Sequence, residues 1–298
     1  MRCLLTVLLA SVSCILALSS SAQDTATSAP IFVWPDLAPG ETQRTTGTQL
    51  PMRAVDTPPI IRIENTRRPP MSVYPATKNP NGSAVLILPG GGFGKVVPNL
   101  EGSEAAQWLC DMGVTCFVLN YRTRLPNNTQ EPGWKRPLQD AQRAMRWIRT
   151  NADQWNLEPD RIGLLAFSAG GQVGAILITD ESSAYEAIDK IDEQSFRPDF
   201  AMLIYPWNMY EKQTDKLMPA IQVNANTPPS FIVHTHDDGS TSLGSVLLYA
   251  DMKRQGVPAE LHVYETGGHG YGTRVRPNSN IGSWTDRATD WLTRRLPR

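Results

Sequence analysis

The feature of this sequence that most constrains its fold is a short apolar strand that runs directly into a serine and then a helix. Residues Ile162 to Phe167 are the apolar run, Ser168 follows at once, and residues 172–179 are typical of a helix. A turn this sharp needs small residues around the serine, and the sequence supplies Ala166, Ala169 and Gly170. A serine and a glycine in this spacing are common, so the rest of the chain decides whether Ser168 is a nucleophile.

Predicted strands and helices alternate along the chain on both sides of this segment. The predicted strands are residues 59–65, 71–76, 84–88, 115–121, 162–167, 201–205, 231–235 and 261–264, and the predicted helices are residues 101–112, 140–152, 172–179, 243–255 and 284–296. This alternation is typical of an α/β fold whose mostly parallel sheet has helices on both faces. We therefore predict an eight-stranded sheet with one antiparallel edge, formed by the first two strands. Residues 206–229 lack a clear period and are expected to form only a minimal lid.

The chain divides into three predicted parts. Residues 1–22 carry Arg2, an apolar run and the small residues Ser20-Ser21-Ala22, which together are the pattern of a cleaved signal peptide. Residues 23–58 are expected to be an extended mature N-terminus, and residues 59–298 the catalytic domain. The apolar run is too short for a stable membrane span, so we expect a secreted or periplasmic protein. A net charge of −1 gives no reason to expect nucleic acid or an anionic membrane as a partner.

Two cysteines, Cys110 and Cys116, remain once the predicted signal peptide is removed. In an exported protein they could form a disulfide that closes a helix-to-strand loop, and the alternative is two buried thiols. The sequence leaves both open. The cysteines lack the spacing of a zinc site, and we expect no metal and no organic cofactor. Asn81 and Asn127 begin sequons, which matter only in a host that glycosylates.

Only four histidines are available as a general base for Ser168. His269 lies in the glycine-rich segment 267–272, just after the last predicted strand, and such a loop can bring an imidazole to the carboxyl edge of the sheet. An acid that orients this imidazole is expected after the preceding strand, where Asp237 and Asp238 lie side by side. The spacing from His234 favours Asp238 over Asp237, which would then stabilise the loop. Metal binding by His234, His236 and the two aspartates is the weaker alternative, because a complete ligand pattern is missing.

Three glycines follow the first predicted parallel strand, at residues 90–92. Attack of a serine on a carbonyl carbon passes through an oxyanion, and backbone amides that point at it supply much of the catalysis. A glycine loop at this place can present such amides, so we expect the oxyanion donors to be Gly91, Gly92 and Ala169. A phosphate-binding loop is the alternative, but the Gly-Lys-Ser/Thr ending and the Gly-x-Gly-x-x-Gly spacing are both absent from this segment.

With these residues in view, the chain resembles the α/β-hydrolase esterases, and within them the secreted acetyl xylan esterase-like branch. The segments that carry the resemblance are residues 34–40, 89–94, 120–122, 137–141, 161–171 and 267–272. The resemblance implies an α/β-hydrolase fold and hydrolysis of short-chain esters, with acetyl groups on a polysaccharide as the natural substrate. Two positions depart from the branch: Ala166 replaces the first glycine of Gly-x-Ser-x-Gly, and Gly239 to Ser242 replaces a Val-Pro type turn.

We therefore predict a secreted serine esterase with a Ser168, His269 and Asp238 triad. Its substrate would be an acetylated carbohydrate or a small ester. Aromatic residues near the motifs, Phe93, Trp207 and Tyr271, are candidates for substrate binding, although core packing explains such residues equally well. A generic carboxylesterase is the first alternative. A serine peptidase is a further alternative, and activity on peptides would indicate it. A non-catalytic carbohydrate-binding protein is the last, and a triad that does not react would indicate that.

Overall fold

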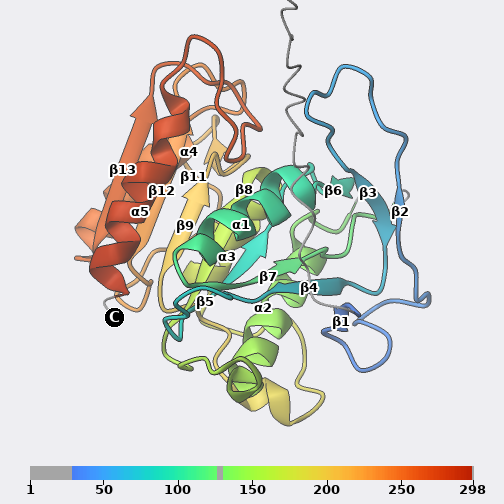
Figure 1. Cartoon of the computed structure of the whole chain (residues 1–298). Helices are drawn as coiled ribbons and strands as arrows, with labels where there is room; N and C mark the ends of the chain where they lie inside the picture. Colours follow the sequence, from blue (N-terminus) through green and yellow to red (C-terminus); the bar gives the residue numbers. More distant parts are fainter. Residues whose placement is uncertain (1–28, 126–129, 297–298) are drawn as a thin grey trace, which may run out of the picture.

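A single mixed sheet of eight strands forms the centre of the protein (Figure 1). The computed structural model describes residues 29–125 and 130–296; the predicted signal peptide and the sequon at Asn127 lie outside them. The strand order is β1 (Ile31–Phe32), β4 (Pro70–Tyr74), β7 (Thr115–Leu119), β5 (Ala84–Leu88), β8 (Ile162–Phe167), β9 (Ala201–Ile204), β12 (Ser230–Thr235) and β13 (Ala259–Tyr264). From β7 to β13 the neighbouring strands are parallel to one another. Only β4 runs in the opposite direction, antiparallel to both of its neighbours, β7 and β1. The predicted α/β-hydrolase fold is confirmed.

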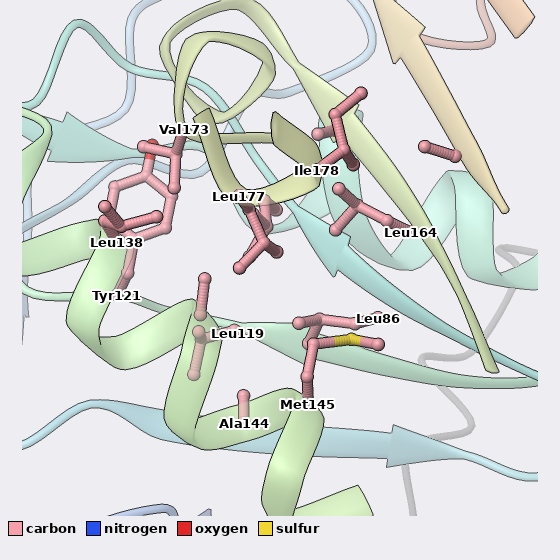
Figure 2. Packing of buried hydrophobic residues seen from close by; sticks show 14 of the residues in the cluster. Leu86, Leu119, Tyr121, Leu138, Ala144, Met145, Leu164, Val173, Leu177 and Ile178 are labelled. Carbon is pink, nitrogen blue, oxygen red and sulfur yellow. The ribbon is translucent and has the colours of Figure 1, made fainter. Parts of the chain in front are cut away.

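Helices cover both faces of this sheet. Successive side chains on a strand point to opposite faces, so strands that are apolar throughout need helices on both. On one face, α2 (Lys135–Thr150), α3 (Ser168–Thr179) and α4 (Leu243–Arg254) pack on residues such as Leu86 and Leu164. Figure 2 shows this layer where α2 and α3 meet the sheet. On the other face, α1 (Glu104–Asp111) and α5 (Trp284–Arg295) pack on residues such as Val85 and Phe231. The central strands are therefore buried on both sides, which explains their continuous apolar sequences.

The antiparallel edge differs from the prediction in one strand. We expected residues 59–65 to pair beside β4, but β3 (Ile63–Thr66) leaves the main sheet and lies between β2 (Thr46–Gln49) and β6 (Lys95–Val96). In that small sheet Ile63 lies opposite Val96, and Glu64 lies opposite Lys95. Apolar and oppositely charged cross-strand pairs of this kind stabilise antiparallel strands. In the main sheet, β1 pairs with β4 in its place. β1 belongs to residues 23–58, which we expected to be an extended N-terminus.

A buried tryptophan anchors this N-terminal segment to the domain. The Trp34 side chain is fully buried, and its indole N–H donates to Asp140 Oδ1 at 2.8 Å. The same carboxylate accepts hydrogen bonds from Arg122, whose Nε lies 2.9 Å from Oδ1 and whose backbone N lies 2.8 Å from Oδ2. Both charged side chains are fully buried. Burial of a charge is unfavourable unless it is paired and hydrogen-bonded, so the stability of this ion pair depends on the contacts described.

Smaller features complete the description. Residues 206–229 contain only a short hairpin, formed by β10 (Tyr210–Glu211) and β11 (Lys216–Leu217). Cys110 and Cys116 are both free thiols, half-buried and buried respectively, so the structure shows the thiol alternative. Within residues 29–125 and 130–296, no helix has the length and apolar character that crossing a membrane requires.

Asp140→Ala should destabilise the fold by about 3–5 kcal/mol, because it leaves the Arg122 guanidinium buried without its carboxylate. The measurement is the free energy of unfolding from chemical denaturation. Asp36→Ala is the matched control, since Asp36 pairs with Arg44 at the surface and an exposed pair contributes only about 0–1 kcal/mol. Equal losses in the two variants would contradict the role given to the buried pair.

Candidate active site

Ser168 occupies a strained turn between β8 and α3. Its φ of +52° lies in the left-handed region, which non-glycine residues rarely adopt and which is typical of a nucleophile on a sharp strand-to-helix turn. Two residues later, a Cβ on Gly170 would lie 2.2 Å from the carbonyl oxygen of Leu88. Only glycine therefore allows α3 to start this close to the end of β5.

Ala166, the departure from the usual serine motif, fits without displacing Ser168. Its side chain is fully buried, and a Cβ added to Gly174, in the second turn of α3, would lie 2.9 Å from the Ala166 methyl. The absent side chain at Gly174 therefore makes the room that the methyl needs. The methyl therefore packs beneath the turn.

Three side chains from the ends of three strands form one hydrogen-bonded chain. Ser168 Oγ lies 2.7 Å from His269 Nε2, and His269 Nδ1 lies 2.6 Å from Asp238 Oδ2. A carboxylate can only accept, so Nδ1 carries the proton and Nε2 is free to accept from the serine hydroxyl. The structure thus brings together the three residues predicted as a triad, with the geometry that a general base needs.

Asp238 is held as a carboxylate by three donors. Besides His269, Nε2 of the buried His234 donates to Oδ2 at 3.1 Å, and the backbone N–H of Ser240 donates to Oδ1 at 2.7 Å. Burial by itself would raise the pKa of Asp238, but the hydrogen bonds from His234 and His269 outweigh it and hold this pKa well below its usual range. The group is therefore suited to stabilise a positive charge on His269.

The neighbouring Asp237 stabilises the loop, which is the role expected for whichever of the two aspartates is not the acid of the triad. Its carboxylate accepts the backbone N–H groups of Gly268 at 2.9 Å and Gly267 at 3.1 Å. These hydrogen bonds, with that of Gly268 the stronger influence, lower the pKa of Asp237. Asp237 therefore fastens the loop that carries His269. His234 uses its Nδ1 to accept from Ser245 at 2.8 Å, and no group of three potential metal ligands occurs among the described residues.

The glycine loop lies directly beside Ser168. A Cβ on Gly90 would be 2.5 Å from the Ser168 Cβ, and Gly91 and Gly92, both with positive φ, line the same pocket as Ser168 and His269. Ala169 belongs to the first turn of α3, where backbone N–H groups have no acceptor within the helix. Of the predicted oxyanion donors, Gly91 and Gly92 thus line the pocket that contains the serine, and Ala169 directly follows it.

A buried glutamate and tyrosine beneath this loop were not predicted as site residues. Glu101 Oε2 accepts the N–H of Gly90 at 2.7 Å, and Tyr205 donates its hydroxyl to Glu101 Oε1 at 2.8 Å. Burial raises the pKa of Glu101, while the hydrogen bonds from Tyr205 and Gly90 oppose this rise. Nothing in the sequence around Glu101 distinguishes it from an ordinary residue at the start of a helix, and nothing around Tyr205 indicates that the two side chains meet.

The site opens into a pocket of about 560 Å³. Its wall includes Trp207, one of the predicted substrate-binding residues, and the side chains of Arg62 and Lys95. Phe93 is buried behind Trp207, with ring centroids 5.9 Å apart. Tyr271 is almost fully buried, and its ring packs against Tyr205 at 4.3 Å. Trp207 therefore reaches the pocket, whereas Phe93 and Tyr271 support its walls.

Comparison with known proteins points to esterases. Residues 71–201 match the BD-FAE family. An acetylxylan esterase from Xylanibacter ruminicola is 28% identical over 219 residues, which are 65% of this chain and 42% of that protein. Endo-1,4-beta-xylanase B from Butyrivibrio fibrisolvens is 29% identical over 205 residues, covering 62% of this chain and 32% of that protein. The chain thus spans less than half the length of these curated relatives.

A solved structure extends the likeness to most of the chain. The acetyl ester-xyloside bifunctional hydrolase from Caldicellulosiruptor lactoaceticus superposes with a TM-score of 0.69 and 27% sequence identity. The superposition covers 90% of this chain and 96% of that one. Together with the eight-stranded sheet, this similarity shows that the chain has the α/β-hydrolase fold, and residues 71–201 are similar to the BD-FAE family.

Proposed function

We propose that this protein is a serine esterase that removes acetyl groups from xylan or a related polysaccharide. The observation that carries the proposal is the hydrogen-bonded chain from Ser168 through His269 to Asp238, with the glycine loop beside it. The names of the relatives support the acetyl group and the polysaccharide. The described part of residues 206–229 is a short hairpin rather than a large cap, which suits a bulky, polar leaving group.

The proposed reaction runs in two halves. Ser168 Oγ attacks the acetyl carbonyl while His269 Nε2 takes its proton, and the amides of Gly91, Gly92 and Ala169 hold the oxyanion. The C–O bond to the sugar then breaks, and His269 returns the proton to the departing hydroxyl. Water, deprotonated by His269, attacks the acetyl-enzyme and releases acetate, which regenerates Ser168. Asp238 stabilises the imidazolium in both halves. The mechanism uses no metal and no organic cofactor.

Ser168→Ala should lower kcat on an aryl acetate by about 10⁶-fold, because the nucleophile of a triad acts as a unit with its base. The variant should also lose labelling by a serine-reactive fluorophosphonate. Circular dichroism and thermal unfolding serve as controls for the fold. Full ester hydrolysis by the folded variant would refute the serine mechanism.

Asp238→Asn should lower kcat by about 10⁴-fold, since an amide at this position favours the wrong imidazole tautomer. Asp237→Asn is the matched comparison, one residue away, and should cost much less because Asp237 accepts from the backbone of the loop, at Gly267 and Gly268, rather than from the imidazole. Steady-state kinetics of both variants on one aryl acetate give the ratio. A larger loss in Asp237→Asn would reverse the assignment of the acid.

The substrate is tested by acetate release from acetylated xylan, pectin and mannan, with small aryl acetates for comparison and Ser168→Ala as the blank. Release from one polymer supports a carbohydrate esterase and names its substrate. Hydrolysis of aryl acetates together with no release from any polymer would reduce the proposal to a generic carboxylesterase.

We also propose that the protein is exported after cleavage of the predicted signal peptide at Ala22. The support is the sequence pattern of residues 1–22. Expression of the full chain in a host with a secretory pathway should give a product outside the cytoplasm that begins at Gln23, as determined by N-terminal sequencing. A product that keeps residues 1–22 would contradict this.

A further inference from the structure

The glycine loop and the loop that carries His269 are tied together by a buried carboxylate and a buried hydroxyl. Gly90 donates to Glu101, Tyr205 donates to the other oxygen of Glu101, and the N–H of Gly272 donates to Tyr205 Oη at 2.9 Å. We propose that Glu101 and Tyr205 are positioning residues, which set the spacing between the oxyanion donors and His269. The inference rests on the serine esterase function proposed above.

The hydrogen positions in this link are fixed by elimination. Tyr205 Oη already receives the N–H of Gly272, so its own hydrogen needs an acceptor, and Glu101 Oε1 is 2.8 Å away. Glu101 Oε2 accepts from Gly90, so each oxygen of the carboxylate serves one of the two loops. A buried donor or acceptor without its partner is costly, and the complete set therefore favours a single arrangement of both loops.

The backbone of Tyr205 supports the same role. Tyr205 directly follows β9 and has a φ of +40°, a conformation that is unfavourable for a bulky residue and is often kept only at functional sites. Its N–H donates to Val233 O at 2.7 Å, which fixes the residue against β12. From this position the Tyr205 ring meets the His269 ring edge-on, with centroids 4.9 Å apart. Tyr205 therefore contacts the base as well as the link to the glycine loop.

The decisive variant is Tyr205→Phe, which keeps the ring beside His269 and removes only the hydroxyl. We expect kcat on an aryl acetate to fall about 10- to 100-fold, the loss typical when a partner that orients a reactive group is removed, while KM changes less than about 3-fold. Glu101→Gln should give a loss of similar size, because a glutamine has only one acceptor oxygen and therefore cannot accept from both Tyr205 and Gly90. In the double variant the losses should not multiply, since the two residues act as one unit.

Tyr185→Phe is the matched control. Tyr185 is another buried tyrosine whose hydroxyl donates to a carboxylate, that of Asp192, but it packs against Trp34, outside the pocket residues. Its removal should lower thermal stability about as much and leave kcat unchanged. Equal kcat in Tyr205→Phe and the wild type, or equal losses in Tyr205→Phe and Tyr185→Phe, would overturn the inference. A wild-type protein without Ser168-dependent hydrolysis would instead refute the proposed function.

Discussion

The close approach of two backbones beside Ser168 is the constraint on which the site depends. A side chain at Gly170 would lie 2.2 Å from the carbonyl oxygen of Leu88 and 2.6 Å from that of Pro89. Since β5 and β8 are neighbours, with Leu88 opposite Ala166, the chain leaving β5 must cross the first turn of α3. That crossing places Gly90 against Ser168. The packing that closes the fold therefore also brings the glycine loop to the serine.

The order of the strands does the rest of the assembly. β8, β9, β12 and β13 are consecutive neighbours and are parallel, so the residues that follow them all lie at one edge of the sheet. These residues are Ser168, Tyr205, Asp238 and His269. Each leaves its strand in a short loop, and the distances between neighbouring strands bring their side chains within hydrogen-bonding reach. Residues that are far apart in the sequence thus meet at one site although each lies in a short loop.

Local sequence was sufficient wherever one short pattern determined the outcome. Apolar runs predicted the six parallel strands, and the glycine-rich loops marked both sides of the pocket. The edge strand could not be found in this way, because β1 has only two residues and depends on the burial of Trp34 beside Asp140. Glu101 and Tyr205 are 104 residues apart and meet only after the sheet has formed. Tyr271, a candidate for substrate binding, is a further case, since its side chain is buried and its ring packs against Tyr205.

The pairing of Ala166 with Gly174 shows that the space under the serine is shared between a strand and a helix. The Ala166 methyl and Leu203 Cδ2 both lie 2.9 Å from the place that a Cβ on Gly174 would occupy, so the close packing limits the volume of these positions together. A glycine at the first position of Gly-x-Ser-x-Gly is one way of keeping this volume small. In this chain the smaller residue lies six positions after the serine, so a motif that stops at Gly170 ends before the compensating residue.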